Sequence, residues 1–198
     1  MRVQKKYKGL IFVVSGPSGS GKSTLLARLL RQKPIRQRLA RAISFTTRPK
    51  RSGEKNGRDY FFISQKRFKL LQKAKKFIEW TRYLGYYYAT PQDFIERQHK
   101  KSRHIILCLD LKGASEVRRI YPKNTITIFV LPPSLEALAE RIKRRCHKTR
   151  KEEIQKRLRL AKQELLAGRR YNYCLVNKDL GEVTRQLKEI ILNEISRR

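Results

Sequence analysis

A glycine-rich segment near the start of the chain limits the possible folds more than any other feature. Residues 16–23 read Gly-Pro-Ser-Gly-Ser-Gly-Lys-Ser, directly after the apolar run 10–14 and directly before an apolar stretch that begins at Thr24. Glycines let the backbone curl until successive N–H groups converge on one anion, and the positive end of a following helix strengthens the attraction. A glycine- and serine-rich surface turn is the alternative, but strand, spacing, lysine and serine are all present here. The segment therefore predicts a phosphate-binding loop between a buried strand and a helix, which binds a nucleoside triphosphate.

Two residues of this loop carry distinct chemistry. Lys22 can reach the β- and γ-phosphates of a nucleotide, and the Ser23 hydroxyl can ligate Mg²⁺. We therefore expect Mg²⁺ as the cofactor, bound together with the nucleotide. The residues expected to hold the triphosphate are Gly16, Pro17, Ser18, Gly19, Ser20, Gly21, Lys22, Ser23 and Thr24.

The charge of the chain is extreme. There are 49 Lys and Arg residues against 16 Asp and Glu, a net charge of +33. Such a balance suggests a nucleic-acid partner, but the cations are spread along the chain and no basic tail or repeat concentrates them. We expect no specific nucleic-acid partner, and non-specific, salt-sensitive adhesion to RNA.

Length and cysteine content define the class of protein. A chain of 198 residues is expected to form a single domain, and no apolar run approaches the ~20 residues that span a bilayer, so no membrane partner is expected. Cys108, Cys146 and Cys174 have neither metal-like nor disulfide-like spacing, which is typical of the reducing cytoplasm. The sequence leaves open whether the protein is a monomer or a homo-oligomer.

Strand and helix patterns alternate along most of the chain, which predicts an α/β fold with a parallel sheet core and helices on both faces. The predicted strands are 10–14, 104–109, 125–131 and 173–176, and the predicted helices are 22–33, 113–120, 134–144, 151–167 and 182–195, with Ser134 as an N-cap. This core is expected to comprise residues 8–43, 104–140 and 158–198.

Two regions interrupt the alternation. Residues 44–103 contain short β-like pieces (44–47, 60–63, 77–80 and 86–88) rich in aromatic and turn residues, and residues 141–157 are almost wholly charged. On a phosphate-loop core, such regions indicate an inserted acceptor-binding segment and a small lid, respectively.

The insertion contains long, ordered motifs. Residues 46–60 read Thr-Thr-Arg-x-x-Arg-x-Gly-Glu-x-x-Gly-x-Asp-Tyr, and Phe-Ile-Glu-Trp (77–80) and Gly-Tyr-Tyr-Tyr (85–88) follow. Together with the phosphate loop, these motifs resemble the guanylate kinase family over nearly the whole chain. The resemblance implies the P-loop nucleoside monophosphate kinase fold. It also implies transfer of the γ-phosphoryl group of ATP to GMP and dGMP, which gives ADP and the diphosphate.

The residues of the insertion suit this acceptor. Arg48 and Arg51 can present two planar forks to one phosphate, and Glu79 can accept two parallel N–H bonds from the edge of guanine, which adenine does not offer. Asp110 follows the strand 104–109 at the carboxyl edge of the sheet, where it could serve the base or the Mg²⁺ shell. By resemblance, the GMP-binding residues are Ser44, Arg48, Arg51, Tyr60, Glu79, Tyr88, Thr90 and Asp110.

The resemblance also implies a set of cations around the transferred group. The expected catalytic residues are Lys22, Arg51, Arg145 and Arg157, and Arg141 and Asn177 are expected to bind ATP. Arg144 can replace Arg145, because the lid is one residue longer than the family pattern. No general base is needed, since the attacking oxygen belongs to an ionised phosphate.

Three positions depart from the usual pattern of the family. Ala89, Cys108 and Lys112 stand where the family usually has glycine, aspartate and glutamine.

Other functions remain open. A related kinase with another phosphorylated acceptor, such as a ribose bisphosphate, would not need a residue like Glu79 that recognises a base. A non-catalytic scaffold module of this type typically has a degraded phosphate loop, whereas 16–23 is complete. An RNA-associated protein is the third alternative to a GMP kinase, and it rests on charge alone.

Overall fold

The computed structural model describes residues 9–145 and 151–198. Backbone contacts divide the chain into two compact units, the first formed by the described parts of 1–11, 39–107 and 112–125, and the second by those of 12–38, 108–111 and 126–198. The predicted insertion falls within the first unit, and the described residues of the predicted lid fall within the second.

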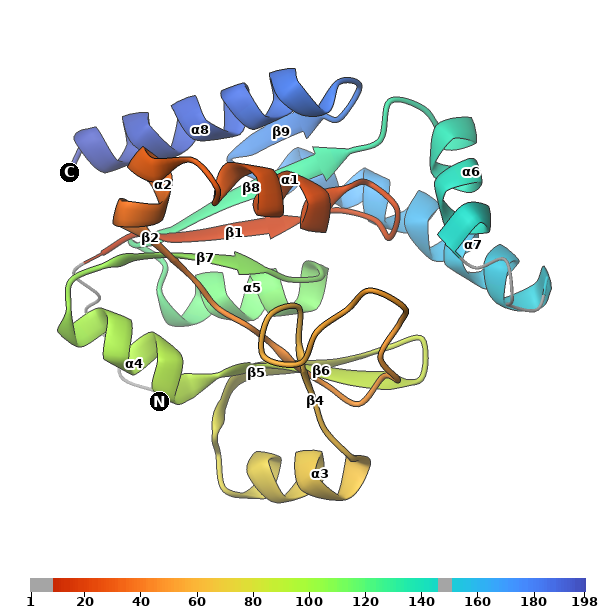
Figure 1. Cartoon of the computed structure of the whole chain (residues 1–198), viewed down its shortest axis with the longest axis horizontal. Coiled ribbons are helices and arrows are strands. Elements are labelled where there is room, and N and C mark those ends of the chain that lie inside the picture. Colours follow the sequence, from red (N-terminus) through yellow and green to blue (C-terminus); the bar gives the residue numbers. More distant parts are fainter. Residues whose placement is uncertain (1–8, 146–150) are drawn as a thin grey trace. The chain divides into compact units, whose positions relative to one another are not determined.

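Five strands form a sheet in the order β2-β7-β1-β8-β9 (Figure 1). These are β1 (Ile11–Ser15), β2 (Leu39–Arg41), β7 (His104–Cys108), β8 (Thr125–Leu131) and β9 (Tyr173–Val176). β2 pairs with β7, and β8 with β9, in parallel. All four strands predicted for this sheet are therefore found to within one residue at either end, and the α/β class with a parallel sheet flanked by helices is confirmed.

The second unit contains the helices α1 (Lys22–Leu29), α2 (Lys33–Arg38), α6 (Leu135–Arg145), α7 (Lys151–Ala167) and α8 (Leu180–Ser196), with a 3₁₀ turn η1 (Gly168–Arg170). α1 packs against α8. The prediction of one helix over 22–33 is wrong, because the chain leaves the helix after Leu29 and starts α2 at Lys33. Pro34 explains the break, since it has no N–H and its ring clashes with the carbonyl group four residues earlier.

The helices α6 and α7 bury an apolar seam. The Ser134 hydroxyl accepts a hydrogen bond from the N–H of Ala137 at 3.1 Å, which confirms the predicted N-cap of α6. Leu138 and Ile142 of α6 pack with Ala161 of α7. The charged segment 141–157 therefore contributes apolar side chains to the packing of the two helices.

The first unit contains a second sheet with the strand order β4-β3-β6-β5. Its strands are β3 (Phe45–Thr46), β4 (Phe61–Phe62), β5 (Phe77–Tyr83) and β6 (Tyr86–Pro91). β5 and β6 form an antiparallel hairpin through Leu84 and Gly85, whose φ angles of 50° and 84° suit the tight two-residue turn of a twisted hairpin.

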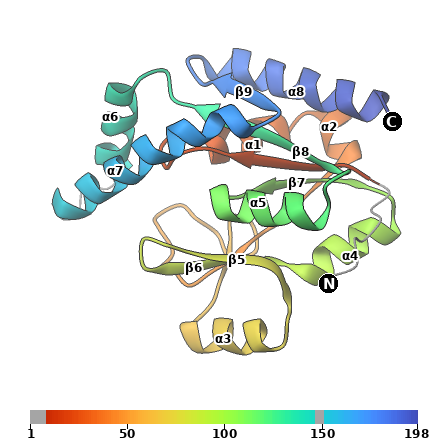
Figure 2. The same cartoon turned by 180° about the vertical axis from the view of Figure 1, so that it is seen from behind.

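The other helices of this unit are α3 (Gln65–Lys73), α4 (Gln92–Lys100) and most of α5 (Leu111–Ile120). α3 lies against the hairpin of β5 and β6, where Phe68 packs with Phe77 and Ala89 (Figure 2). Neither α3 nor α4 was predicted from the sequence.

In the part of the chain that the structure describes, no helix is both long and apolar enough to cross a membrane. Cys108 and Cys174 are free thiols, whereas Cys146 lies outside the described residues.

Candidate active site

The phosphate loop lies between the buried strand β1 and the first turn of α1. The Lys22 ammonium donates to the carbonyl oxygens of Gly16 (2.6 Å) and Pro17 (2.9 Å), so its charge is held over the loop itself. Gly16 has a φ of 142°, and a Cβ there would meet the carbonyl oxygen of Val130. Only glycine fits at this point, because both the backbone angle and the neighbouring strand exclude a side chain. Ser23 and Thr24 are exposed on the first turn of α1.

Asn177 supports the loop from the end of β9. Its buried side-chain amide donates to the carbonyl oxygen of Ser20 at 2.8 Å, and a Cβ on Gly21 would meet the same amide. The Arg141 guanidinium donates to the Asn177 carbonyl oxygen at 3.4 Å. The structure thus brings the predicted ATP residue Asn177 to the phosphate loop through a structural bond, and it brings Arg141 to Asn177.

The sequence analysis missed an acidic residue in this unit, Glu164 of α7. Burial raises the pKa of Glu164 to about 7; the positive charge of Lys22 opposes this shift and the negative charge of Asp110 adds to it. Its Oε2 atom is buried and has no hydrogen-bond partner among the described residues. Glu164 follows Ala161 by three positions, so it lies on the packing face of α7. An acid on an apolar helix face was the signal that could have revealed it.

The predicted lid arginines are found in two different environments. Arg157 of α7 is buried, with 7% of its surface exposed, whereas Arg144 of α6 is exposed and lies 3.4 Å from Glu140. Arg145 is the last residue of α6, and its side chain lies outside the described part of the structure. Arg144 and Arg145 thus remain alternatives for the same role.

In the first unit, the predicted phosphate clamp is built around Arg48. Its guanidinium donates to both carboxylate oxygens of Glu54, at 2.8 and 3.0 Å, and the backbone N–H of Arg51 donates to the same carboxylate at 2.8 Å. The rings of Tyr60 and Tyr88 meet edge to face at 6.0 Å, and Arg48 lies 5.5 Å from the Tyr60 ring centre. Four predicted acceptor residues therefore gather here, around a carboxylate to which the sequence analysis gave no role.

The charges of the clamp stabilise one another. Burial alone would raise the pKa of Glu54, but the hydrogen bonds from Arg48 and the Arg51 N–H outweigh it and lower that pKa. Burial opposes the charge of Arg48 in the same way, and the interactions with Glu54 and Tyr88 raise its pKa. Glu54 thus holds the Arg48 guanidinium in place as a charged, buried group.

Glu79, the residue predicted to recognise the guanine base, is buried in the second sheet, which also contains Tyr88. Glu79 of β5 pairs across the hairpin with Thr90 of β6, and the Thr90 hydroxyl donates to the Glu79 carboxylate at 2.6 Å. Both residues are at most 5% exposed. The single hydroxyl proton of Thr90 is directed at Glu79 in this structure, so Thr90 orients that carboxylate. Ser44 lies directly before β3, and its carbonyl oxygen accepts a hydrogen bond from the N–H of Phe61.

Asp110 is the remaining residue predicted to bind GMP. It lies in the second unit, where its charge acts on Glu164 together with that of Lys22.

Known proteins resemble this chain over nearly its whole length. A sequence model of the family described as guanylate kinase matches residues 8–194. The guanylate kinase of Symbiobacterium thermophilum is 40% identical over 192 residues, which cover 97% of this chain and 89% of the relative. That of Caldanaerobacter subterraneus subsp. tengcongensis is 38% identical over 189 residues, which cover 96% and 89%. The chain belongs to the guanylate kinase family.

A solved structure supports the same assignment. The crystal structure of guanylate kinase from Anaplasma phagocytophilum superposes with a TM-score of 0.78 at 28% identity, over 96% of this chain and 88% of that one. The P-loop kinase fold is thereby confirmed, and the family activity is phosphorylation of GMP by ATP.

The departures from the usual guanylate kinase pattern lie in different places. Ala89 is fully buried against Phe68 and Phe77, on the side of the hairpin away from Glu79, so its methyl group fills core space. Cys108 ends β7, and Lys112 lies in α5.

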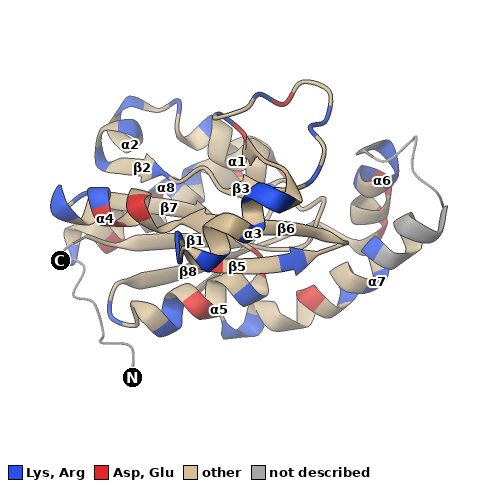
Figure 3. Ribbon diagram, turned by 90° about the horizontal axis from the view of Figure 1, so that it is seen from below, with Lys and Arg blue, Asp and Glu red and all other residues tan. Residues whose placement is uncertain are grey.

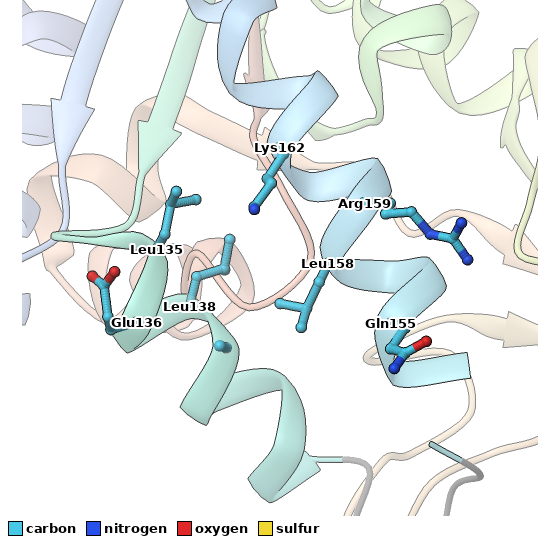
Figure 4. Close-up of a pocket in the computed structure, with 8 residues that line it drawn as sticks. Leu135, Glu136, Leu138, Gln155, Leu158, Arg159 and Lys162 are labelled. Atoms are coloured by element: carbon cyan, nitrogen blue, oxygen red, sulfur yellow. The ribbon is translucent and has the colours of Figure 1, made fainter. Parts of the chain in front are cut away.

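An apolar groove lies between α6 and α7, with a volume of about 610 Å³. Leu138 and Leu158 point toward one another across it (Figure 4). Its other lining residues are Leu135, Glu136, Ala139, Gln155, Arg159 and Lys162. None of the predicted site residues is among those that line this groove.

Proposed function

We propose that this chain transfers the γ-phosphoryl group of ATP to GMP and dGMP. The observation that carries the proposal is the buried Glu79–Thr90 pair, which lies in the same sheet as the Arg48 clamp. A carboxylate fixed by a neighbouring hydroxyl can accept both N–H groups of the guanine edge. A kinase for a sugar phosphate would have no use for such a pair.

The reaction needs positive charge and alignment more than proton transfer. An oxygen of the GMP phosphate attacks the γ-phosphorus of ATP, the bond to the β–γ bridging oxygen breaks, and ADP leaves with that electron pair. In our proposal, Lys22, Arg51 and Arg157 stabilise the charge that develops on the transferred group, together with Arg145 or Arg144. Arg141 and Asn177 hold the nucleotide end of ATP.

The donor set near the loop fits Mg²⁺. The exposed Ser23 hydroxyl and the Asp110 carboxylate are hard oxygen ligands, and the described residues contain no cluster of three His, Cys, Asp or Glu residues that would form an all-protein metal cage. Magnesium is usually held in this way, by one or two protein oxygens plus substrate phosphates. When bound, it would neutralise charge on the phosphates of ATP.

The two interruptions of the core take their roles from this reaction. We propose that residues 44–103 bind GMP and that residues 141–157 form a lid, which keeps water from the γ-phosphate. The proposal also includes a single-domain organisation and a cytoplasmic location. It includes non-specific adhesion to RNA, because the net charge is +33.

The test is an acceptor panel of GMP, dGMP, AMP, UMP, CMP and IMP with Mg-ATP, in a coupled assay that follows ADP. We expect ADP release with GMP and dGMP. Lys22→Ala and Arg51→Ala should each reduce turnover steeply, whereas Lys50→Ala, a change at the exposed neighbour of Arg51, should not. Release of ADP with another acceptor alone would overturn the GMP assignment, and no release at all would favour a scaffold module.

A further inference from the structure

The exposed side of α3 and the segment after it carry a continuous series of cations. Between residues 64 and 78 the chain has no Asp or Glu. The Lys and Arg side chains of this stretch are all exposed, and none of them forms an ion pair with an acid among the described residues: Lys66, Arg67, Lys69, Lys73, Lys75 and Lys76. By contrast, Arg97 and Arg119, on other helices, are paired with Asp93 and Glu116.

Of these charges, Lys73 in the last turn of α3 complements the helix dipole, whereas those of the first turn oppose it. Lys66 and Arg67 lie in its first turn, which contains no acid, so they face the positive end of the helix dipole. Lys69 and Lys73 are like charges four positions apart on one helix face. Figure 3 shows this run of cations along α3. A polyanion bound here would offset repulsion that the fold leaves uncompensated.

Aromatic residues of the hairpin share this side of the sheet. Glu79 and Thr90 form a cross-strand pair on one face, so Trp80 and its partner Ala89 lie on the other, with Arg82 and its partner Tyr87. Phe68 of α3 stacks on Tyr87 at 4.9 Å, which places these residues beside α3.

The indole of Trp80 is accessible there. Its ring is 6.1 Å from that of Tyr87, the Arg82 guanidinium is 5.8 Å from the same Tyr87 ring, and Trp80 is 48% exposed. An exposed indole beside a guanidinium can stack on a nucleobase.

We propose that the cations of residues 64–78, together with Trp80 and Arg82, form a surface that binds single-stranded RNA without regard to base sequence. We refer to it as the basic face. Its cations contact phosphates, and Trp80 stacks on an unpaired base. Since every base has a π-face, stacking requires an open strand and tolerates any sequence. The basic face lies across the sheet from Glu79, so this binding is separate from recognition of GMP; it rests on the adhesion to RNA proposed above and assigns that adhesion a surface and a single-stranded partner.

A membrane surface is the other polyanion to consider. Leu70 (52% exposed) and Trp80 are the large apolar side chains that the described part of the basic face exposes. Two such side chains among seven cations offer little apolar area to insert into lipid. Phosphate contacts with one stacking residue are the combination that single-strand binding uses.

The chain provides its own probe, because Trp80 is its single tryptophan. Titration with an oligouridylate of about a dozen nucleotides should quench the tryptophan fluorescence, and an RNA duplex with the same number of phosphates should quench it less. Saturating GMP should not displace the oligonucleotide. Binding without quenching would place the RNA elsewhere and overturn the proposal.

Charge variants locate the phosphate contacts. The triple variant Lys66→Gln/Lys69→Gln/Lys73→Gln should reduce the slope of log affinity against log salt by about 2, since each phosphate contact on a single strand contributes about 0.7. The matched control, Lys33→Gln/Arg36→Gln/Arg38→Gln, removes the same charge from exposed positions on α2 and should leave the slope nearly unchanged. If the two triple variants reduced the slope equally, the attraction would be diffuse and the proposal would be wrong.

A variant of the stacking residue separates RNA from other partners. Trp80→Leu should weaken binding of labelled oligouridylate at least about fivefold in an anisotropy titration, with less effect on the duplex. Its melting temperature and its ADP release with GMP should match the wild type, so failure of the kinase assignment would be seen independently. The proposal would be contradicted if the protein bound vesicles of anionic phospholipid with the same dependence on Trp80. It would also be contradicted if Trp80→Leu weakened binding of the single strand and of the duplex equally.

Discussion

Two ion pairs of this chain have similar lengths and very different surroundings. Arg48 and Glu54 lie 2.8 Å apart, with side chains 8% and 15% exposed, whereas Arg119 and Glu116 lie 2.6 Å apart, with side chains 58% and 35% exposed. Distance alone would rank the second pair as the stronger. Burial reverses that order, because a buried charge that loses its partner cannot turn to water.

The substitution Glu54→Gln tests this argument. Loss of one partner of a buried pair costs about 3–5 kcal/mol. Glutamine keeps one acceptor oxygen and Glu54 is partly accessible, so we expect about 2–3 kcal/mol. For a chain of this length the melting temperature should fall by about 5–10 °C. The KM for GMP should rise because Arg48 loses its anchor, while the KM for ATP should stay unchanged.

Glu116→Gln is the matched control for Glu54→Gln in thermal melting. It removes the acid of an exposed pair, and such pairs contribute little to stability, so we expect no measurable shift. The effect of Glu54→Gln should also depend on pH. Because the pKa of Glu54 is lowered from 4.5, its contribution is present above 4.5 and is lost as the pH falls through the lowered value. Equal melting shifts for the two variants, or a Glu54→Gln shift that does not shrink in acid, would refute the reasoning.

Three further changes test other parts of the site. Glu79→Gln should raise the KM for GMP at least tenfold, which corresponds to about 1.4 kcal/mol of binding free energy, and leave the KM for ATP unchanged. If steady-state kinetics showed equal increases in both KM values, another residue would have to recognise the base. Gly16→Ala should abolish ATP binding in a calorimetric titration and lower the melting temperature, since its Cβ would meet the carbonyl oxygen of Val130. Protonated Glu164 contributes stability that is complete below 4.5 and is lost as the pH rises through about 7. Glu164→Gln should therefore stabilise the protein more in alkaline than in acidic melts, and a difference that does not vary with pH would contradict this.

The core could be predicted because its signals are local. The strand β1, the loop and the start of α1 follow one another in sequence, and the apolar runs of β8 and β9 mark their own limits. β2 escaped prediction because it has three residues and its place depends on pairing with β7, more than sixty residues away. The helix α3 was missed although Ser64 caps it through the N–H of Arg67, because its many cations conceal the apolar positions Phe68 and Leu71.

The site was predictable where a side chain would contact substrate, and less so where it contacts another side chain. Arg48 and Glu79 are recognisable from the chemistry of phosphate and guanine. Glu54 acts on Arg48 and on the backbone of Arg51, so its role appears only once the loop is folded. Thr90 likewise acts on Glu79, through a strand register that no single residue encodes.

That register also decides which residues face the GMP side and which form the basic face. In a regular strand Phe77 and Glu79 would point to the same side, and Trp80 to the other. The pairing shifts between Phe77 and Glu79, where Phe77 is opposite Pro91 and Glu79 is opposite Thr90. A bulge of this kind re-aims the chain by one position, so Phe77 joins the core under α3 and Glu79 turns the opposite way. Because this shift arises from pairing with β6, alternation along residues 77–80 could not reveal it, and the structure was needed to assign the adjacent residues Glu79 and Trp80 to different surfaces.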